Sequence, residues 1–421
     1  MIFGFMKKTC FPGERVAGYA REMFLSGLMI YILCMSIRTT MFSLYAVTLL
    51  GKYLGVGIVA LKILLYDRYS LKKLVIAVVL CAVAMVTFVF GGYGEPICLM
   101  VLILGAENID FDDVIRAYIA VTLVVMAAAL AGCICGIIEN IQSYDPESIA
   151  QNLFAGVYLF DSLAGINSFG IQYHTDFGAH IFYLWLSFIY LKRDELKIRY
   201  GWLAIISGIL VRIFSRARLD SILLVALGVS ELLFVLFENR RKILPPPVLG
   251  EMQRKKNLYL LGKISMPAMF VLAFCCTRFY DPGNIVLARI DKLFSGRLMI
   301  GQSGLDKYGI SLTGQWIEMI GNGQANQVTG EYNFIDCAYL MILLQNGILF
   351  FAVIMMLNQY IIQKYKNNTW MIFAWIFIAV SSTTDHHILD TAYNVFLIAA
   401  GCTVFDKISQ DAGLTVIKQE A

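Results

Sequence analysis

One long polar stretch of the sequence combines arginine with glycine and amide side chains, in a chain that is otherwise mostly apolar. It reads FSGRLMIGQSGLDKYGISLTGQ from residue 294 to 315. Ser295 is a good helix cap, and a helix that starts there places Arg297 in its first turn and ends at Gly309. The free amides of a helix N-terminus and a guanidinium bind phosphate together. The alternative is a helix on the membrane surface whose arginine contacts only lipid headgroups.

A preceding helix is expected between residues 284 and 294. Pro282 and Gly283 form a turn signal before Asn284, and apolar residues then recur at helical spacing up to Phe294. The two helices together predict an amphipathic hairpin at the membrane surface.

A second group of charged residues, Arg212, Arg216 and Asp220, is spaced four apart. An arginine inside a membrane span costs about 2.5 to 3.5 kcal/mol, so it needs a partner. One interpretation is an ion pair between Arg216 and Asp220 that joins two helices. The other is a guanidinium that lines an outward cavity and is oriented by Asp220. Arg218 points elsewhere and is expected at the headgroup level.

Several acidic and histidine side chains are candidate bases for taking a proton from a hydroxyl group. Four of the five also have a structural explanation. Asp336 is an N-cap for the span that follows, Asp385 and His386 fit a turn, and His174 is a hydrogen-bond donor at a helix end. The candidates are His174, Glu331, Asp336, Asp385 and His386.

The elements that must position these residues are membrane helices. Hydrophobic residues make up 59% of the chain, charged residues only 15%, and the mean hydropathy is +0.70. At about 20 residues per crossing, the apolar runs predict an all-α, polytopic integral membrane protein with about twelve transmembrane helices. The predicted spans are residues 23–37, 41–65, 74–91, 95–108, 117–137, 173–191, 200–214, 219–237, 258–276, 334–362, 370–384 and 388–405.

The lysines and arginines predict the orientation, because cytoplasmic loops retain positive charge. They place both termini in the cytoplasm, and no cleaved signal sequence is expected. The predicted organisation is a cytoplasmic N-terminus at 1–22, the first nine helices within 23–276, an extracytoplasmic catalytic loop at 277–333, the last three helices within 334–405 and a cytoplasmic tail at 406–421.

Composition also excludes several classes of function. The net charge of +4 is explained by topology and anionic lipid headgroups, and no basic patch interleaved with aromatic residues suggests nucleic acid. Most of the ten cysteines lie in apolar runs and behave as small hydrophobic residues. No C-x-x-C pair is present, so we expect no metal site and no cofactor.

Several short motifs resemble those of the Wzy-type polysaccharide polymerases, which are relatives of the O-antigen ligases. The most specific part is SGRL at 295–298, followed by KYGI at 307–310 and GQ at 314–315. The chain departs from the family at His174, where only the histidine of a Gly-His-Pro-Asn motif is present, and after Asp336, where Asn-Ser is missing. Weaker similarities are GAENIDF at 105–111, FSR at 214–216 and DCAY at 336–339.

The resemblance implies a membrane-embedded glycosyltransferase of the GT-C type in the bacterial plasma membrane. Such an enzyme moves a growing glycan from undecaprenyl diphosphate to the next lipid-linked repeat unit on the outer face, during synthesis of a capsule or O-antigen-like polysaccharide. It implies as partners the lipid-linked oligosaccharide, membrane lipids, and the flippase and chain-length regulator of the same pathway.

The chemistry of that reaction assigns expected roles. A departing diphosphate needs preorganised positive charge, so Arg297 and Arg216 are expected first, with one of the candidate bases. Further contacts to the substrate are expected from charged side chains in the outer loop and from two tyrosines that pack on sugar rings. These residues are Arg218, Arg278, Arg289, Lys307, Tyr308 and Tyr339.

Two other functions stay open. A ligase would join finished glycan to a different acceptor. A transporter such as a flippase for the same lipid would also suit many spans, but transport predicts inverted repeats and broken helices near the membrane midplane, and the sequence shows neither.

Overall fold

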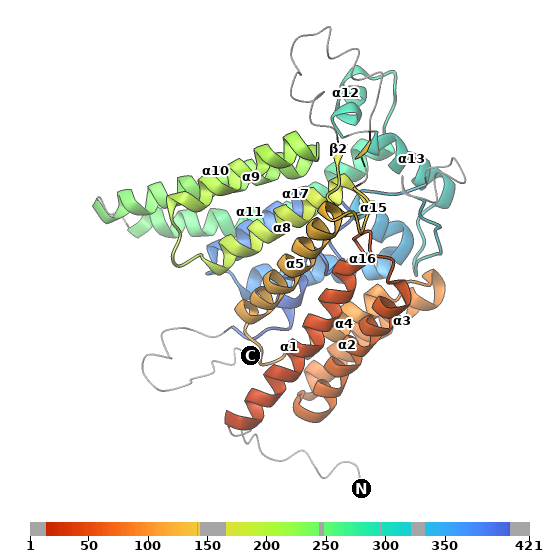
Figure 1. Ribbon diagram of the computed structural model, residues 1–421. Coiled ribbons are helices and arrows are strands. Elements are labelled where there is room, and N and C mark those ends of the chain that lie inside the picture. The colour runs from red at the N-terminus through yellow and green to blue at the C-terminus, as the bar shows by residue number, and fades with distance from the viewer. Residues whose placement is uncertain are drawn as a thin grey trace.

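The computed structural model describes residues 14–140, 142–143, 166–243, 248–294, 296–320 and 333–404. Within these residues the chain is almost entirely helical, as predicted (Figure 1). Its only sheet in the described part is an antiparallel pairing of two-residue strands, β1 (Gln142–Ser143) and β2 (Ile166–Asn167). The predicted ends at 1–13 and 405–421 lie outside the described residues.

The helices fall into three groups along the chain. The first group is α1 (Glu14–Ile37), α2 (Tyr45–Tyr66), α3 (Leu71–Gly91), α4 (Glu95–Gly105) and α5 (Phe111–Ile134). After the small sheet come α8 (His174–Leu191), α9 (Ile198–Phe214), α10 (Arg218–Ile243) and α11 (Val248–Arg278). The remaining elements are α12 (Ile285–Leu293), α13 (Arg297–Tyr308), α15 (Ala338–Met341), the π-helix η1 (Ile342–Asn346), α16 (Gly347–Lys364), α17 (Thr369–Ser381) and the 3₁₀-helix η2 (Phe396–Ala400).

In the described part of the chain, seven helices are long and apolar enough to cross a membrane. They belong to α1, α2, α3, α5, α10, α11 and the continuous run from α15 to α16. These helices support a membrane-embedded protein. Other predicted spans fall on shorter helices, namely α4, α8, α9 and α17. The structure therefore gives fewer full-length spans than the predicted twelve.

The last predicted span, 388–405, is not a continuous helix. It forms turns and the five-residue η2. Asp390 accepts a hydrogen bond from the backbone of Ala392, and Asn394 accepts one from Phe396. Such local bonds from side chain to backbone compete with helix formation. The prediction of a twelfth helix was wrong for this reason.

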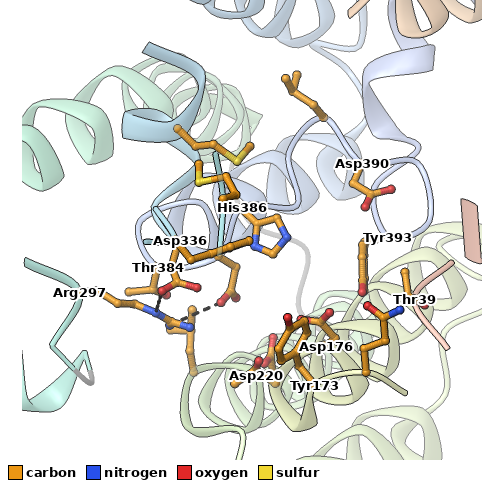
Figure 2. Close-up of a pocket in the computed structure, with 18 of the residues that line it drawn as sticks. Thr39, Tyr173, Asp176, Asp220, Arg297, Asp336, Thr384, His386, Asp390 and Tyr393 are labelled. Atoms are coloured by element: carbon orange, nitrogen blue, oxygen red, sulfur yellow. Dashed lines mark ion pairs between the residues drawn. The ribbon is translucent and has the colours of Figure 1, made fainter. Parts of the chain in front are cut away.

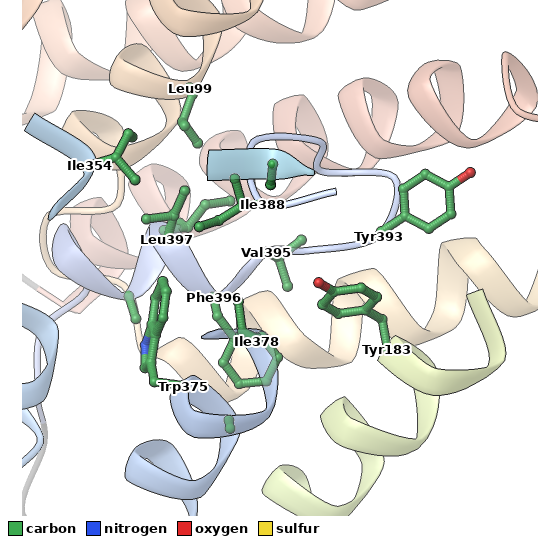
Figure 3. Packing of buried hydrophobic residues seen from close by; sticks show 14 of the residues in the cluster. Leu99, Tyr183, Ile354, Trp375, Ile378, Ile388, Tyr393, Val395, Phe396 and Leu397 are labelled. Atoms are coloured by element: carbon green, nitrogen blue, oxygen red, sulfur yellow. The ribbon is translucent and has the colours of Figure 1, made fainter. Parts of the chain in front are cut away.

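This irregular segment lies in the interior of the helical bundle. Figure 3 shows Val395, Phe396 and Leu397 packed beside Trp375 of α17 and Tyr183 of α8. All residues from 391 to 400 are buried. Lys364 at the end of α16 donates hydrogen bonds to the carbonyls of residues 399, 400 and 402. Non-helical backbone at membrane depth is tolerated where protein surrounds it and satisfies its polar groups.

Two buried lysines of α2 show how the bundle accommodates charge. Lys52 is 2% exposed and pairs with Glu95 of α4 at 2.6 Å. Lys62 is 1% exposed and pairs with Asp67 at 2.6 Å, and it also donates to the carbonyls of Gly105 and Glu107. A buried charge needs such a partner. These lysines therefore fix α2 to the two ends of α4.

A break in the predicted span 334–362 brings polar residues to one place. The helix widens into η1 and then turns at Gly347, whose φ of 81° is easily adopted only by glycine. Gly314, with φ 98°, packs directly against Gly347, so the loop after α13 crosses the helix at the break. Gln345 and Asn346 of η1 line the cavity described below. Single-turn π-helices are frequent at functional sites.

Candidate functional site

A cavity of about 1190 Å³ lies between α13 and the ends of α1, α4, α8 and α10 (Figure 2). The loop between α17 and η2 forms another of its walls. Six of the residues predicted from the sequence line this cavity, although they come from five separate elements. They are His174, Arg218, Arg297, Asp336, Asp385 and His386.

Arg297 lies between two carboxylates. Its Nε is 3.4 Å from Asp336 Oδ2, and its Nη1 is 3.6 Å from Asp385 Oδ1. The side chains are 17%, 16% and 6% exposed for Arg297, Asp336 and Asp385. Ser381 Oγ also donates to Asp385 Oδ2 at 3.3 Å. The arginine and both acids are therefore held at the cavity wall, largely shielded from water.

The bounds of α12 and α13 agree with the prediction. The anion site expected at the start of α13 is not available, because a side chain already occupies it. Asn284 caps α12 by accepting from two backbone amides, and Gly309 ends α13. The first amides of α13 already donate to Asp291 Oδ1, at 2.8 Å from Leu298 and 3.2 Å from Met299. Asp291 is 7% exposed and occupies the place expected for phosphate. Only the Arg297 guanidinium is left of that predicted site, and Ser295 lies outside the described residues.

Burial changes the acid–base properties of the loop after α17. It raises the pKa of Asp385 from 3.8 to about 6, although the nearby Arg297 charge acts in the opposite direction. Burial also lowers the pKa of His386 from 6.5 to about 4. His386 packs edge-on against Phe334, with ring centroids 4.9 Å apart. At neutral pH its imidazole is uncharged and able to accept a proton.

Arg216 and Asp220 do not behave as either sequence interpretation expected. No ion pair joins them within the described residues, and Arg216 does not line the cavity. Arg216 sits in the turn between α9 and α10 with a φ of 55°, which is uncommon for a residue other than glycine. Asp220 does line the cavity and is 2% exposed. Gly178 of α8 makes room for it, because a Cβ there would lie 2.9 Å from Asp220 Oδ2.

The other predicted substrate contacts lie away from the cavity lining. Arg278 pairs with Asp306 at 3.5 Å on the surface, and Arg289 is exposed on α12. Lys307 lies over the ring of Tyr308.

The two tyrosines expected to contact sugar rings make other contacts. The Tyr308 hydroxyl accepts a hydrogen bond from Asn333 at 2.7 Å. Tyr339 is 1% exposed and donates to the Ala379 carbonyl at 2.7 Å, so it belongs to the core. The candidate base Glu331 lies outside the described residues.

Sequence reasoning missed a group of polar residues on the opposite side of the cavity. Thr39, Asp176, Asp390 and Tyr393 line it there, and Figure 2 shows them away from Arg297. Asp390 did carry a signal, because it is an acid inside an apolar run that was assigned to a membrane span. Thr39 and Tyr393 have no distinguishing local pattern.

Acids outnumber arginines among the residues that line the cavity. The sequence had suggested a site dominated by guanidinium groups. The lining instead contains Arg38, Arg218 and Arg297 against Glu95, Asp176, Asp220, Asp336, Asp385 and Asp390. The cavity is therefore mixed in charge, and any anion must bind near one of the arginines.

Potential metal ligands do not converge in the part of the chain that the structure describes. Among these residues, no group of three or more His, Cys, Asp or Glu side chains is arranged to hold a metal ion. The described cysteines are all free thiols.

Comparison with known proteins finds no family model, no curated protein and no solved structure that matches the chain.

Proposed function

We propose that the protein is a membrane polysaccharide polymerase, a glycosyltransferase of the GT-C type in the bacterial plasma membrane. It transfers a growing glycan from undecaprenyl diphosphate to the next lipid-linked repeat unit on the outer face, with both termini in the cytoplasm. The observation that carries this proposal is the position of Arg297, between Asp336 and Asp385 and near the neutral His386, on the wall of a large cavity.

The reaction needs one bond to break and one to form. The bond between the anomeric carbon and the diphosphate oxygen breaks, and its electron pair leaves with the diphosphate. The acceptor hydroxyl forms the new glycosidic bond and loses its proton to His386. Arg297 stabilises the negative charge on the departing diphosphate, and such preorganised electrostatic stabilisation is usually the main source of an enzyme's rate enhancement. His386 is uncharged at neutral pH and lies beside Arg297, so it can take the proton, and its pKa of about 4 makes it a weak base.

Asp336 and Asp385 orient the guanidinium in this proposal. A bound diphosphate adds negative charge beside two acids, and that repulsion has to be relieved. Asp385 can relieve it by taking up a proton, since its pKa is already raised to about 6. Neutralising such a group at pH 7 costs only about 1.4 kcal/mol.

One observation favours a transporter of lipid-linked oligosaccharide as the second candidate. Acids outnumber arginines around the cavity, and ionisable groups within membrane proteins often serve proton-coupled transport. An O-antigen-ligase-type transferase is the alternative within the same chemistry, because it differs only in the acceptor.

Reconstitution of the purified full-length protein in vesicles separates these functions. With lipid-linked repeat units as the sole substrate, a polymerase makes a ladder of longer glycans. The Arg297→Ala variant should make none at equal protein level, whereas Arg278→Ala, which alters a surface arginine away from the cavity, should elongate normally. Translocation without elongation would establish the transporter, and transfer only to an added foreign acceptor would establish the ligase.

A further inference from the structure

A buried stack of three rings lies behind the cavity wall. Tyr393 is placed between His180 and His387, with ring centroids 4.1 and 3.8 Å away and interplanar angles of 27° and 29°. His180 Nε2 is 2.8 Å from the hydroxyl of Thr39, and His387 Nε2 is 3.9 Å from Asp176 Oδ1. The stack therefore holds the Tyr393 ring in one orientation.

The Tyr393 hydroxyl is directed toward the cavity. Tyr393 is 1% exposed, and its oxygen makes no hydrogen bond of normal geometry, but it interacts with the side chains of Asp176 and Thr39. Figure 2 shows this hydroxyl group near Thr39 and Asp176, with Asp390 on the adjoining wall. A polar ligand group in the cavity would complete the hydrogen bonding of this hydroxyl.

The carboxylates around Tyr393 define what kind of ligand fits. Asp176 and Asp390 face the same part of the cavity, and Asp390 is held in place because it accepts from the Ala392 amide at 2.9 Å. Carboxyl groups pair with sugar hydroxyl groups, because they accept hydrogen bonds when ionised and also donate one when protonated, and the ionised form repels phosphate. This end of the cavity is therefore suited to a sugar ring, and the Arg297 end is suited to diphosphate.

We propose that Thr39, Asp176, Asp390 and Tyr393 form a second subsite, which binds the acceptor sugar by its hydroxyl groups. The proposal rests on the polymerase function given above and adds where the acceptor lies. Figure 2 shows His386 between this subsite and Arg297. A hydroxyl of the bound acceptor thus lies next to the base, and the donor diphosphate lies beyond it.

Binding measurements on the full-length protein in lipid nanodiscs test the subsite. One probe is the free oligosaccharide released by mild acid from the lipid-linked repeat units, and the other is undecaprenyl diphosphate without glycan. Tyr393→Phe keeps the ring stack and removes only the hydroxyl. It should weaken oligosaccharide binding about tenfold, the usual scale for one missing hydrogen bond, and leave undecaprenyl diphosphate binding unchanged.

A matched control is Tyr118→Phe in α5. Tyr118 is also fully buried, but it does not line the cavity. This variant should bind both probes like the wild type. Asp390→Asn is the second test, because asparagine still accepts from the Ala392 amide but removes the charge. It should weaken oligosaccharide binding several-fold, and the melting temperature of each variant verifies that it is folded.

The outcomes separate the subsite from the polymerase function. Oligosaccharide affinities of Tyr393→Phe and Asp390→Asn within twofold of the wild type would overturn the subsite, as would a wild type that does not bind the oligosaccharide. If ladders still form in that case, the polymerase function stands alone. If binding depends on Tyr393 but no ladder forms in reconstitution, the sugar subsite stands and the polymerase function fails.

Discussion

Replacing Arg297 with glutamine removes the charge that lies between Asp336 and Asp385. Glutamine retains much of the side-chain length but brings no cation, so the two acids then face each other across an uncharged group. The substitution removes the ion pairs at 3.4 and 3.6 Å, and all three side chains are mostly buried. The variant should therefore be less stable and less active, for separate physical reasons.

The size of the destabilisation can be worked from these distances. Each ion pair corresponds to a gross attraction of about 4 to 5 kcal/mol at an effective dielectric constant of about 20. Desolvation offsets much of this, and breaking a buried pair usually costs about 3 to 5 kcal/mol. Proton uptake by Asp385 limits the destabilisation, because its pKa is already about 6. We expect a net decrease in the free energy of unfolding of about 2 to 3 kcal/mol, or roughly 5 °C in melting temperature.

The pH dependence of this destabilisation has a definite sign. The pKa of Asp385 is higher in the folded protein than its ordinary value of 3.8. Between about pH 6 and pH 4 the folded state therefore binds more protons than the unfolded state, and acidification stabilises the fold. Without Arg297 the pKa of Asp385 rises further, so the defect of the glutamine variant should be smaller at pH 5 than at pH 8.

The double variant Arg297→Gln/Asp385→Asn separates the structural role from the chemical one. A neutral asparagine removes the repulsion from Asp336, so the melting temperature should return to within a few degrees of the wild type. Elongation should stay at least about 100-fold below the wild type, because the guanidinium assigned to the diphosphate is missing. Thermal unfolding in nanodiscs and the rate of ladder formation measure the two effects. Elongation by the double variant at nearly the wild-type rate would refute the assignment of Arg297 to the diphosphate.

Three further predictions address the surroundings of Arg297. His386→Gln should slow elongation at least about 100-fold between pH 6 and 8. Protonation of the imidazole should not reduce the wild-type rate in that range, because the pKa of His386 is about 4. A wild-type-like rate in the variant would exclude His386 as the base. Asp291→Ala uncaps α13, so it should destabilise the protein by about 1 kcal/mol and slow elongation by displacing Arg297. Asp291→Asn should restore both the melting temperature and the rate of ladder formation. Arg278→Ala breaks only an exposed pair with Asp306, so it should lower the free energy of unfolding by less than about 1 kcal/mol and leave the elongation rate within twofold of the wild type. A larger effect would mean that this pair orders α13.

Local signals in the sequence predicted the elements around the site well. The apolar run at 74–91 became α3, because a long apolar stretch has few alternatives to a helix in a membrane. Asn284 and Gly309 marked a helix start and a helix end, because capping depends on the chemistry of single residues. The same signals did not show that Asp291 caps α13, since that contact arises from how the two helices turn against each other.

Contacts between distant parts of the chain set the limits of sequence reasoning. Asp385 was predicted as a candidate base, but its contact with Arg297 follows only from the packing of α13 against the loop after α17. The segment 388–405 illustrates the same limit for the fold. A segment buried inside protein can be as apolar as one that faces lipid, so the hydropathy of this segment favoured a membrane span. Tyr393 was missed for this reason, because a tyrosine in a predicted span gives no sign of facing a cavity.

The interior position of the segment that carries η2 has a consequence for how the protein assembles. A stretch without a full helix has unpaired amides and carbonyls, so it cannot partition into lipid by itself. It has to enter a space that α4, α8, α16 and α17 have already enclosed. Biogenesis of the bundle should therefore end with this step, after the earlier helices have left the insertion machinery.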